Sequence, residues 1–112
     1  MAEYGIIFTM KSIKGTTLNT VVINKLKELK PVLKEKYGIE EFAVFGSVAK
    51  GTDTVQSDVD IAVLKLNLKD PFSLFEAKEY LIKTLDKPVD IGTFGSMKTF
   101  IKNRIQKDFI YV

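Results

Sequence analysis

Apolar residues recur at spacings of three and four over residues 19–37, which is the period of an amphipathic helix. This apolar stripe comprises Val22, Leu26, Leu29, Leu33 and Tyr37. We expect Asn19 or Thr20 to cap the start of the helix, and Gly38 to end it in a left-handed conformation. Pro31 lacks a donor N–H, so it should kink or restart the helix.

Two further helices are predicted in the second half of the chain. Asp70-Pro71 should start one of them, with Asp70 as the cap. Its apolar stripe comprises Leu74, Ala77, Leu81 and Leu85. Ser96 should cap the other helix. The side chains expected to face the core from that helix are Met97, Ile101 and Ile105.

Short apolar runs between these helices predict strands at residues 41–45, 58–64 and 89–94. Residues 47–50 should form a helical turn and residues 51–56 a polar loop, while residues 4–8 and 109–112 are further candidate strands. The order α-β-(turn)-β-α-β-α predicts an α/β (α+β) fold, a small mixed β-sheet packed with helices. We assign residues 17–112 to this domain and treat residues 1–16 as a peripheral N-terminal arm.

Composition narrows the chemistry that such a domain can perform. The 112 residues include neither cysteine nor histidine, which excludes disulfides, thiolate or imidazole metal sites and Ser-His-Asp catalysis. No run approaches the roughly 20 apolar residues of a membrane span, so no membrane role is expected, and the lack of cysteine suits a cytoplasmic protein. The net charge of +3 is typical of a solvated lysine-rich surface, with attraction to a nucleotide or RNA as the alternative.

Gly46 and Ser47 lie where a predicted strand passes into the helical turn. The free N–H groups at a helix N-terminus suit a phosphate, and glycine lets that phosphate approach the backbone closely. A hydroxyl from Ser47 would add a further donor. By itself this pair is a weak signal, because Gly-Ser occurs at many ordinary turns.

Three aspartates supply the candidate acidic chemistry. Asp58 and Asp60 stand one residue apart on a predicted strand, so their carboxylates project from one face and repel each other unless a proton or cation intervenes. Asp90 interrupts the apolar run Val89-Asp90-Ile91, where a carboxylate is costly unless it faces water or a cation. Magnesium accepts such oxygen ligands. Solvent exposure would also account for each aspartate taken alone.

In combination these residues resemble the DNA polymerase β-type nucleotidyltransferase superfamily, and in particular its minimal nucleotidyltransferases. The resemblance covers about residues 18–112 and is carried by three segments: Phe45-Gly46-Ser47-Val48-Ala49-Lys50-Gly51, Ser57-Asp58-Val59-Asp60 and Val89-Asp90-Ile91. It implies the nucleotidyltransferase fold and metal-dependent transfer of a nucleotide.

The same resemblance implies roles for individual residues. Gly46 and Ser47 would bind the phosphates of the nucleotide. The three carboxylates of Asp58, Asp60 and Asp90 would be catalytic and would hold two Mg²⁺ ions, with Mn²⁺ as an alternative, and Asp90 would also help to deprotonate the attacking hydroxyl. Lys50 is a further nucleotide-binding candidate, because it alone supplies positive charge in its segment.

The implied activity is transfer of AMP from ATP, or of another nucleotide from its triphosphate, to a tyrosine of a HEPN-domain RNase toxin, so that the protein acts as an antitoxin. The resemblance implies arginine or a bulky polar residue in many relatives where this chain has Val48, and Lys50 lacks the two-pronged geometry of arginine. The alternative is therefore a catalytically weak or inactive nucleotide-binding module that neutralises its partner by docking. Direct binding of nucleic acid is a third, less favoured hypothesis. The base, the acceptor and the oligomeric state stay open.

Overall fold

The structure is a computed structural model in which we describe residues 18–54, 57–68 and 70–112. The N-terminal arm and the candidate strand at residues 4–8 lie outside the described residues. The elements are α1 (Leu18–Tyr37), β2 (Ile39–Phe45), α2 (Gly46–Lys50), β3 (Val59–Leu66), α3 (Ser73–Leu85), β4 (Val89–Thr93), the 3₁₀ turn η1 (Phe94–Ser96), α4 (Thr99–Gln106) and β5 (Ile110–Tyr111).

The four strands form one mixed sheet in the order β4-β3-β2-β5. β2 runs antiparallel to both β3 and β5, whereas β3 and β4 are parallel. A parallel pair needs a crossover connection, and α3 supplies it between β3 and β4. The predicted small mixed sheet packed with helices is confirmed. The candidate strand at residues 109–112 is confirmed as the two-residue β5.

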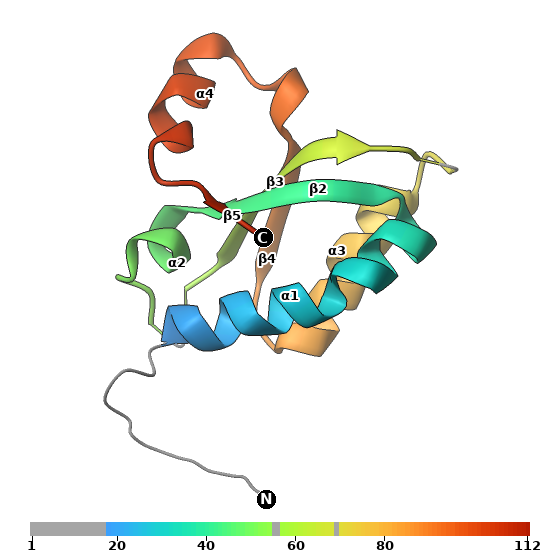
Figure 1. Ribbon diagram of the computed structural model, residues 1–112, viewed down its shortest axis with the longest axis horizontal. Helices are drawn as coiled ribbons and strands as arrows, with labels where there is room; N and C mark the ends of the chain where they lie inside the picture. Colours follow the sequence, from blue (N-terminus) through green and yellow to red (C-terminus); the bar gives the residue numbers. More distant parts are fainter. Residues whose placement is uncertain (1–17, 55–56, 69) are drawn as a thin grey trace, which may run out of the picture.

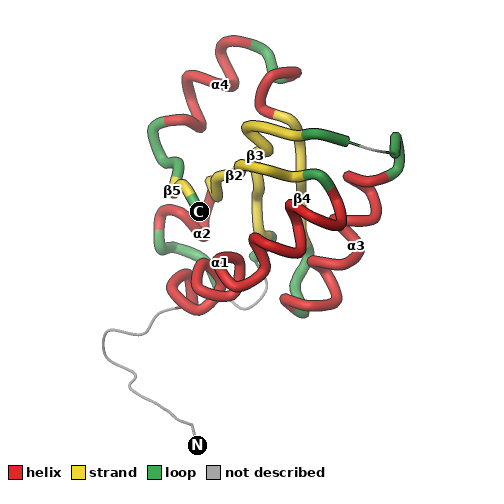
Figure 2. The backbone as a smooth tube through the Cα atoms, turned by 45° about the vertical axis from the view of Figure 1, so that its right-hand side comes forward, coloured by secondary structure: helices red, strands yellow, loops and turns green. Residues whose placement is uncertain are grey.

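The hydrophobic core lies between the sheet and the pair α1 and α3 (Figure 1). All five residues of the predicted stripe on α1 are buried, and Ala77 and Leu81 face them from α3. The sheet contributes alternate residues of β2 and β3, which are Phe42, Val44, Val59, Ile61 and Val63. Helix α4 stands on the other side of the sheet, as Figure 2 also shows. Within the described residues, no helix combines the length and the apolar character needed to cross a membrane.

The first helix differs from its prediction at the start, and it is continuous in the middle. Asn19 and Thr20 lie inside α1, so neither caps it, and the helix continues through Pro31 without restarting. Pro31 is exposed, while Leu29 and Leu33 beside it are buried, so packing of the apolar face holds the helix together across the proline. Gly38 has φ +74°, which confirms the predicted left-handed end.

The later helices begin after the residues predicted to cap them. Asp70 accepts a 2.7 Å hydrogen bond from the Phe72 N–H, which forms a turn, and α3 starts only at Ser73. Ser96 belongs to η1, where its hydroxyl donates to the Thr93 carbonyl at 3.0 Å. Local side-chain bonds of this kind compete with helix formation and explain both delays.

The core-facing role predicted for the last helix is wrong. None of the side chains of α4 is buried, and Met97, Ile101 and Ile105 are partly or well exposed. The apolar periodicity correctly predicted a helix. The side chains of α4 are not buried, because α1 and α3, the helices that cover the core, pack on the other face of the sheet.

Gly38→Ala should destabilise the fold by on the order of 1–3 kcal/mol. A Cβ at this left-handed position would lie 2.9 Å from the backbone carbon of Asn67 and 3.3 Å from the Cα of Leu68, neither of which can rotate away. Urea unfolding measures the effect. Gly95→Ala is the control, because a Cβ there meets nothing within 4 Å. Equal stability of the two variants would contradict this account of the α1–β2 turn.

Candidate active site

The pairing register of β3 places two of the predicted acidic residues side by side. Asp60 lies opposite Phe45 of β2 on one side and opposite Asp90 of β4 on the other. Residues directly opposite each other share a face of the sheet. Because Val59 and Ile61 point into the core beneath α1 and α3, this row of Phe45, Asp60 and Asp90 lies on the opposite face.

The sequence predicted Asp58 inside a strand. In the structure, Asp58 precedes β3 and is exposed. The Val59 N–H donates to the Pro88 carbonyl at 2.9 Å, which fixes the start of β3 beside the start of β4. Asp58 therefore lies close enough to Asp60 for its negative charge to act on that carboxyl. Burial raises the pKa of the Asp60 carboxyl, and the negative charges of Asp90 and Asp58 raise it further.

Gly46 joins the predicted phosphate-binding turn to the acidic row. It follows Phe45 directly, opens α2 and has φ +75°. A Cβ at Gly46 would lie 3.2 Å from the Cγ of Asp60 and would collide with one of its carboxylate oxygens. Both the backbone angle and the closeness of Asp60 therefore require glycine here. The start of α2 and the Asp60 carboxylate lie in direct contact, although fourteen positions separate Gly46 from Asp60 in the sequence.

The remaining residues of α2 fall into different environments. Ser47 is half-buried in the first turn, beside Gly46. Val48 is fully buried in the core, so its side chain does not face the candidate site. The Lys50 ammonium lies 3.8 Å from a carboxylate oxygen of Asp108, in the turn between α4 and β5. The described ion pairs do not link Lys50 to any of the three aspartates predicted as metal ligands.

The donor set of the site consists of carboxylate oxygens that repel one another. No ion pair among the described residues involves Asp58, Asp60 or Asp90, and the described residues contain no cluster of three or more acidic side chains arranged to hold a metal ion. Mg²⁺ does not need such a cage, since it is usually bound by one or two carboxylates together with waters and substrate phosphates. The residues present therefore fit a divalent cation that arrives with its substrate.

The structure also places next to the candidate site residues that no sequence motif identified. Asp108 pairs with Lys50, and the rings of Phe94, Phe109 and Tyr111 gather next to Phe45. No local pattern in the sequence identifies these contacts, because they join α2 and β2 to the C-terminal turn.

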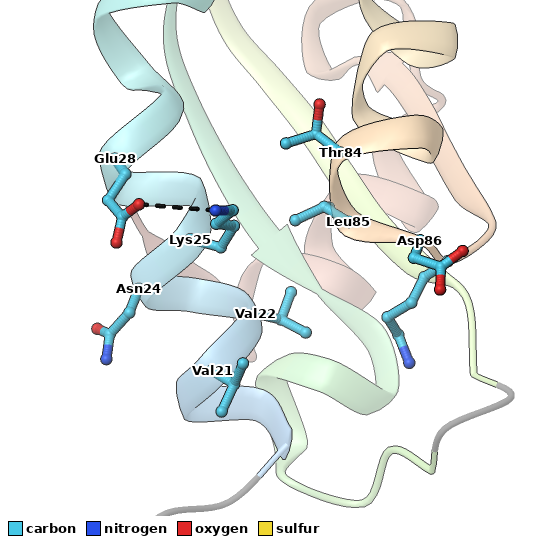
Figure 3. A pocket seen from close by; sticks show the side chains of 9 residues that line it. Val21, Val22, Asn24, Lys25, Glu28, Thr84, Leu85 and Asp86 are labelled. Carbon is cyan, nitrogen blue, oxygen red and sulfur yellow. Dashed lines mark ion pairs between the residues drawn. The ribbon is translucent and has the colours of Figure 1, made fainter. Parts of the chain in front are cut away.

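A cavity of about 720 Å³ lies elsewhere, between the first turns of α1 and the end of α3. Figure 3 shows Val21 and Val22 of α1 facing Leu85 of α3, with the Lys25–Glu28 ion pair (3.8 Å) on the rim. None of the residues predicted as catalytic or nucleotide-binding lines this cavity. The candidate chemistry thus lies on the opposite face of the sheet from this cavity.

Residues 26–112 match the model of the nucleotidyltransferase domain family. Protein adenylyltransferase MntA of Thermococcus cleftensis is 34% identical over 83 residues, which is 74% of this chain and 84% of that protein. MJ0128 of Methanocaldococcus jannaschii, provisionally named a protein adenylyltransferase, is 40% identical over 88 residues, covering 78% of this chain and 90% of its own. A crystal structure of a toxin–antitoxin with AMP-PNP aligns with a TM-score of 0.62 at 28% identity, over 79% of this chain and 69% of that chain.

These matches agree with the fold. The chain belongs to the nucleotidyltransferase domain family, and the protein is a nucleotidyltransferase. Enzymes of this family generally use divalent metal ions.

Asp60→Asn should raise the melting temperature by a few degrees at neutral pH when no divalent cation is present. The folded-state pKa of Asp60 is raised, so folding favours its protonated form, and the contribution of Asp60 to stability is lost as pH rises through that pKa. The advantage of the variant should shrink as pH falls through the raised pKa of Asp60 and should disappear below the usual value of 3.8, where the carboxyl is protonated in both the folded and the unfolded protein. Thermal unfolding monitored by circular dichroism across pH measures both effects.

Glu35→Gln is the matched control for this measurement. It removes the same charge from an exposed position on α1, away from the acidic row. It should leave the pH dependence unchanged. An Asp60→Asn protein that is less stable than the parent at neutral pH would show that the carboxylate is not under electrostatic stress.

Proposed function

We propose that this protein transfers AMP from ATP to a tyrosine of a HEPN-domain toxin and thereby acts as the antitoxin, with residues 17–112 as the catalytic domain and the cytoplasm as its location. The contact between Gly46 and Asp60 carries this proposal, because the turn that we propose to bind phosphate lies against the Asp60 carboxylate. The adenylyltransferase names of the homologues support AMP as the transferred group. The toxin as acceptor follows from the resemblance to minimal nucleotidyltransferases, and the toxin–antitoxin described above supports it.

Gly46 and Ser47 are proposed to hold the phosphates of ATP. The backbone N–H groups at the start of α2 and the Ser47 hydroxyl donate hydrogen bonds to phosphate oxygens. Because Gly46 has no side chain, a phosphate can lie close to the backbone and to the Asp60 carboxylate together. Lys50 can reduce the negative charge nearby once Asp108 releases it.

Asp58, Asp60 and Asp90 are proposed to hold the divalent cations, two Mg²⁺ ions or alternatively Mn²⁺. When bound, such cations offset the charge of the triphosphate and lower the pKa of an attacking hydroxyl. Asp60 and Asp90 lie opposite each other in the sheet, and the negative charges of Asp90 and Asp58 raise the pKa of Asp60, so a cation beside Asp60 would relieve this repulsion. Asp90 is exposed, so it can accept the proton of the incoming hydroxyl.

The reaction joins the acceptor oxygen to the α-phosphorus of ATP. The bond from that phosphorus to the bridging oxygen breaks, pyrophosphate leaves in line, and the proton of the hydroxyl passes to Asp90. The acceptor approaches from the face of the sheet that carries the carboxylates, because α1 and α3 cover the other face. The acceptor is proposed to be a separate protein, in line with the toxin–antitoxin described above.

Asp60→Asn should slow AMP transfer by roughly 10²–10³-fold, the range found when one electrostatic stabiliser of a transition state is removed. The assay incubates the folded protein with ATP, Mg²⁺ and the purified product of the neighbouring gene, and intact-protein mass spectrometry counts the added AMP units. Ser47→Ala should slow transfer less, since the backbone donors remain, and chelation of the metal should stop it. Glu35→Gln should transfer at the parental rate. No mass increase in the parent protein, with both components folded, would refute the proposal.

A second candidate is a module that neutralises its partner by docking, with weak or no catalysis. Two observations favour it: Val48 is buried and so offers nothing to the candidate site, and the Lys50 ammonium lies 3.8 Å from a carboxylate oxygen of Asp108. This candidate predicts that Asp58→Asn leaves neutralisation of the toxin intact in a growth-rescue assay. Loss of rescue by a folded Asp58→Asn protein would exclude docking alone.

A further inference from the structure

Four aromatic rings form a continuous cluster around Phe109. Its ring centroid lies 6.1 Å from that of Phe45, 5.4 Å from that of Phe94 and 5.7 Å from that of Tyr111. The four residues come from β2, from η1 and from the last four residues of the chain, so the fold alone brings them together. Three of the rings are half-buried, and Tyr111 is 62% exposed.

The aromatic cluster begins where the row of carboxylates ends. Phe45 lies directly opposite Asp60 and immediately precedes Gly46, so it borders both the acidic row and the proposed phosphate site. Tyr111 pairs with Ala43 of β2, which shares a face with Phe45 because the two are separated by one residue. The cluster and the carboxylates therefore occupy the same face of the sheet, side by side.

Packing within the protein covers this cluster only in part. α4 follows η1 on the same side of the sheet, yet it buries none of its own side chains. The Lys102 ammonium lies 5.4 Å from the centre of the Phe94 ring, which adds positive charge at the edge of the cluster. The result is a partly exposed π surface with a cation beside it, next to a site proposed to hold phosphates.

We propose that this aromatic cluster is the binding site for the base of the nucleotide, with Tyr111 and Phe109 as its stacking residues. The inference rests on the proposed function, because a base tethered to phosphates at Gly46 lies within reach of rings that border Phe45. Stacking on an aromatic ring is tolerant of sequence because every base has a π face. The cluster therefore contributes affinity for any nucleoside triphosphate, and it favours purines, which offer the larger flat surface.

Isothermal titration of the full chain with ATP and with inorganic triphosphate, each with Mg²⁺, tests this assignment. ATP should bind about tenfold more tightly than triphosphate, which has no base to stack. Tyr111→Ala and Phe109→Leu should each weaken ATP binding by about tenfold and leave triphosphate binding unchanged. Tyr111→Phe keeps the ring and should restore the parental affinity. Phe75→Ala is the control, because it removes an exposed ring (63%) from α3, far from β5.

The outcomes separate this inference from the proposed function. If the parent protein binds neither ATP nor triphosphate, the proposed function fails. If it binds both with equal affinity, or if Tyr111→Ala weakens both ligands equally, the base site is wrong while the proposed function stands. Tyr111 is mostly exposed, so Tyr111→Ala should fold. Its affinity for ATP therefore tests the base site even if Phe109→Leu fails to fold.

Discussion

The register of β3 between β2 and β4 is the constraint on which the rest of the structure depends. Val59, Ile61 and Val63 are all buried on the face beneath α1 and α3, and fully burying such a side chain contributes roughly 1.5–3 kcal/mol. A slip of one residue would exchange the two faces and put Asp60 into the core. The packing of apolar residues thus also determines where the carboxylates stand. It holds Asp60 opposite Asp90 although the two charges repel each other.

That repulsion connects stability with function. Burial and two neighbouring negative charges raise the pKa of Asp60. At neutral pH, when no cation is bound, the ionised carboxylate therefore lowers the free energy of unfolding, and the hydrophobic core offsets this loss. Gly46 brings the start of α2 against the same carboxylate, where any side chain would collide. A site of this kind should bind a cation and an anionic phosphate more tightly when both are present than when only one of them is. The candidate face is open to solvent at Asp58 and Asp90, which are both exposed.

The sequence predicted the elements that depend on local patterns and missed the features that depend on tertiary contacts. The stripe on α1, the left-handed Gly38 and the mixed sheet are as expected, because periodicity and glycine act locally. The cap predicted at Asp70 and the burial of Met97 were wrong, since a local turn and a missing packing layer override propensity. The site residues were named from their spacing, but their juxtaposition required the β2–β3–β4 register. The role proposed for Tyr111 depends on its contact with Phe109, which no local pattern in the sequence identifies.

The central claim is that the acidic row and the glycine turn form one site for a nucleotide and a divalent cation. Thermal unfolding of the parent protein with ATP, with Mg²⁺ and with both tests it most directly, because a ligand that binds only the folded state raises the melting temperature. The account predicts that ATP and Mg²⁺ together stabilise the protein by more than the sum of their separate effects. It also predicts that this excess disappears in Asp60→Asn. Additive shifts in the parent protein, or an excess that survives in the variant, would contradict it.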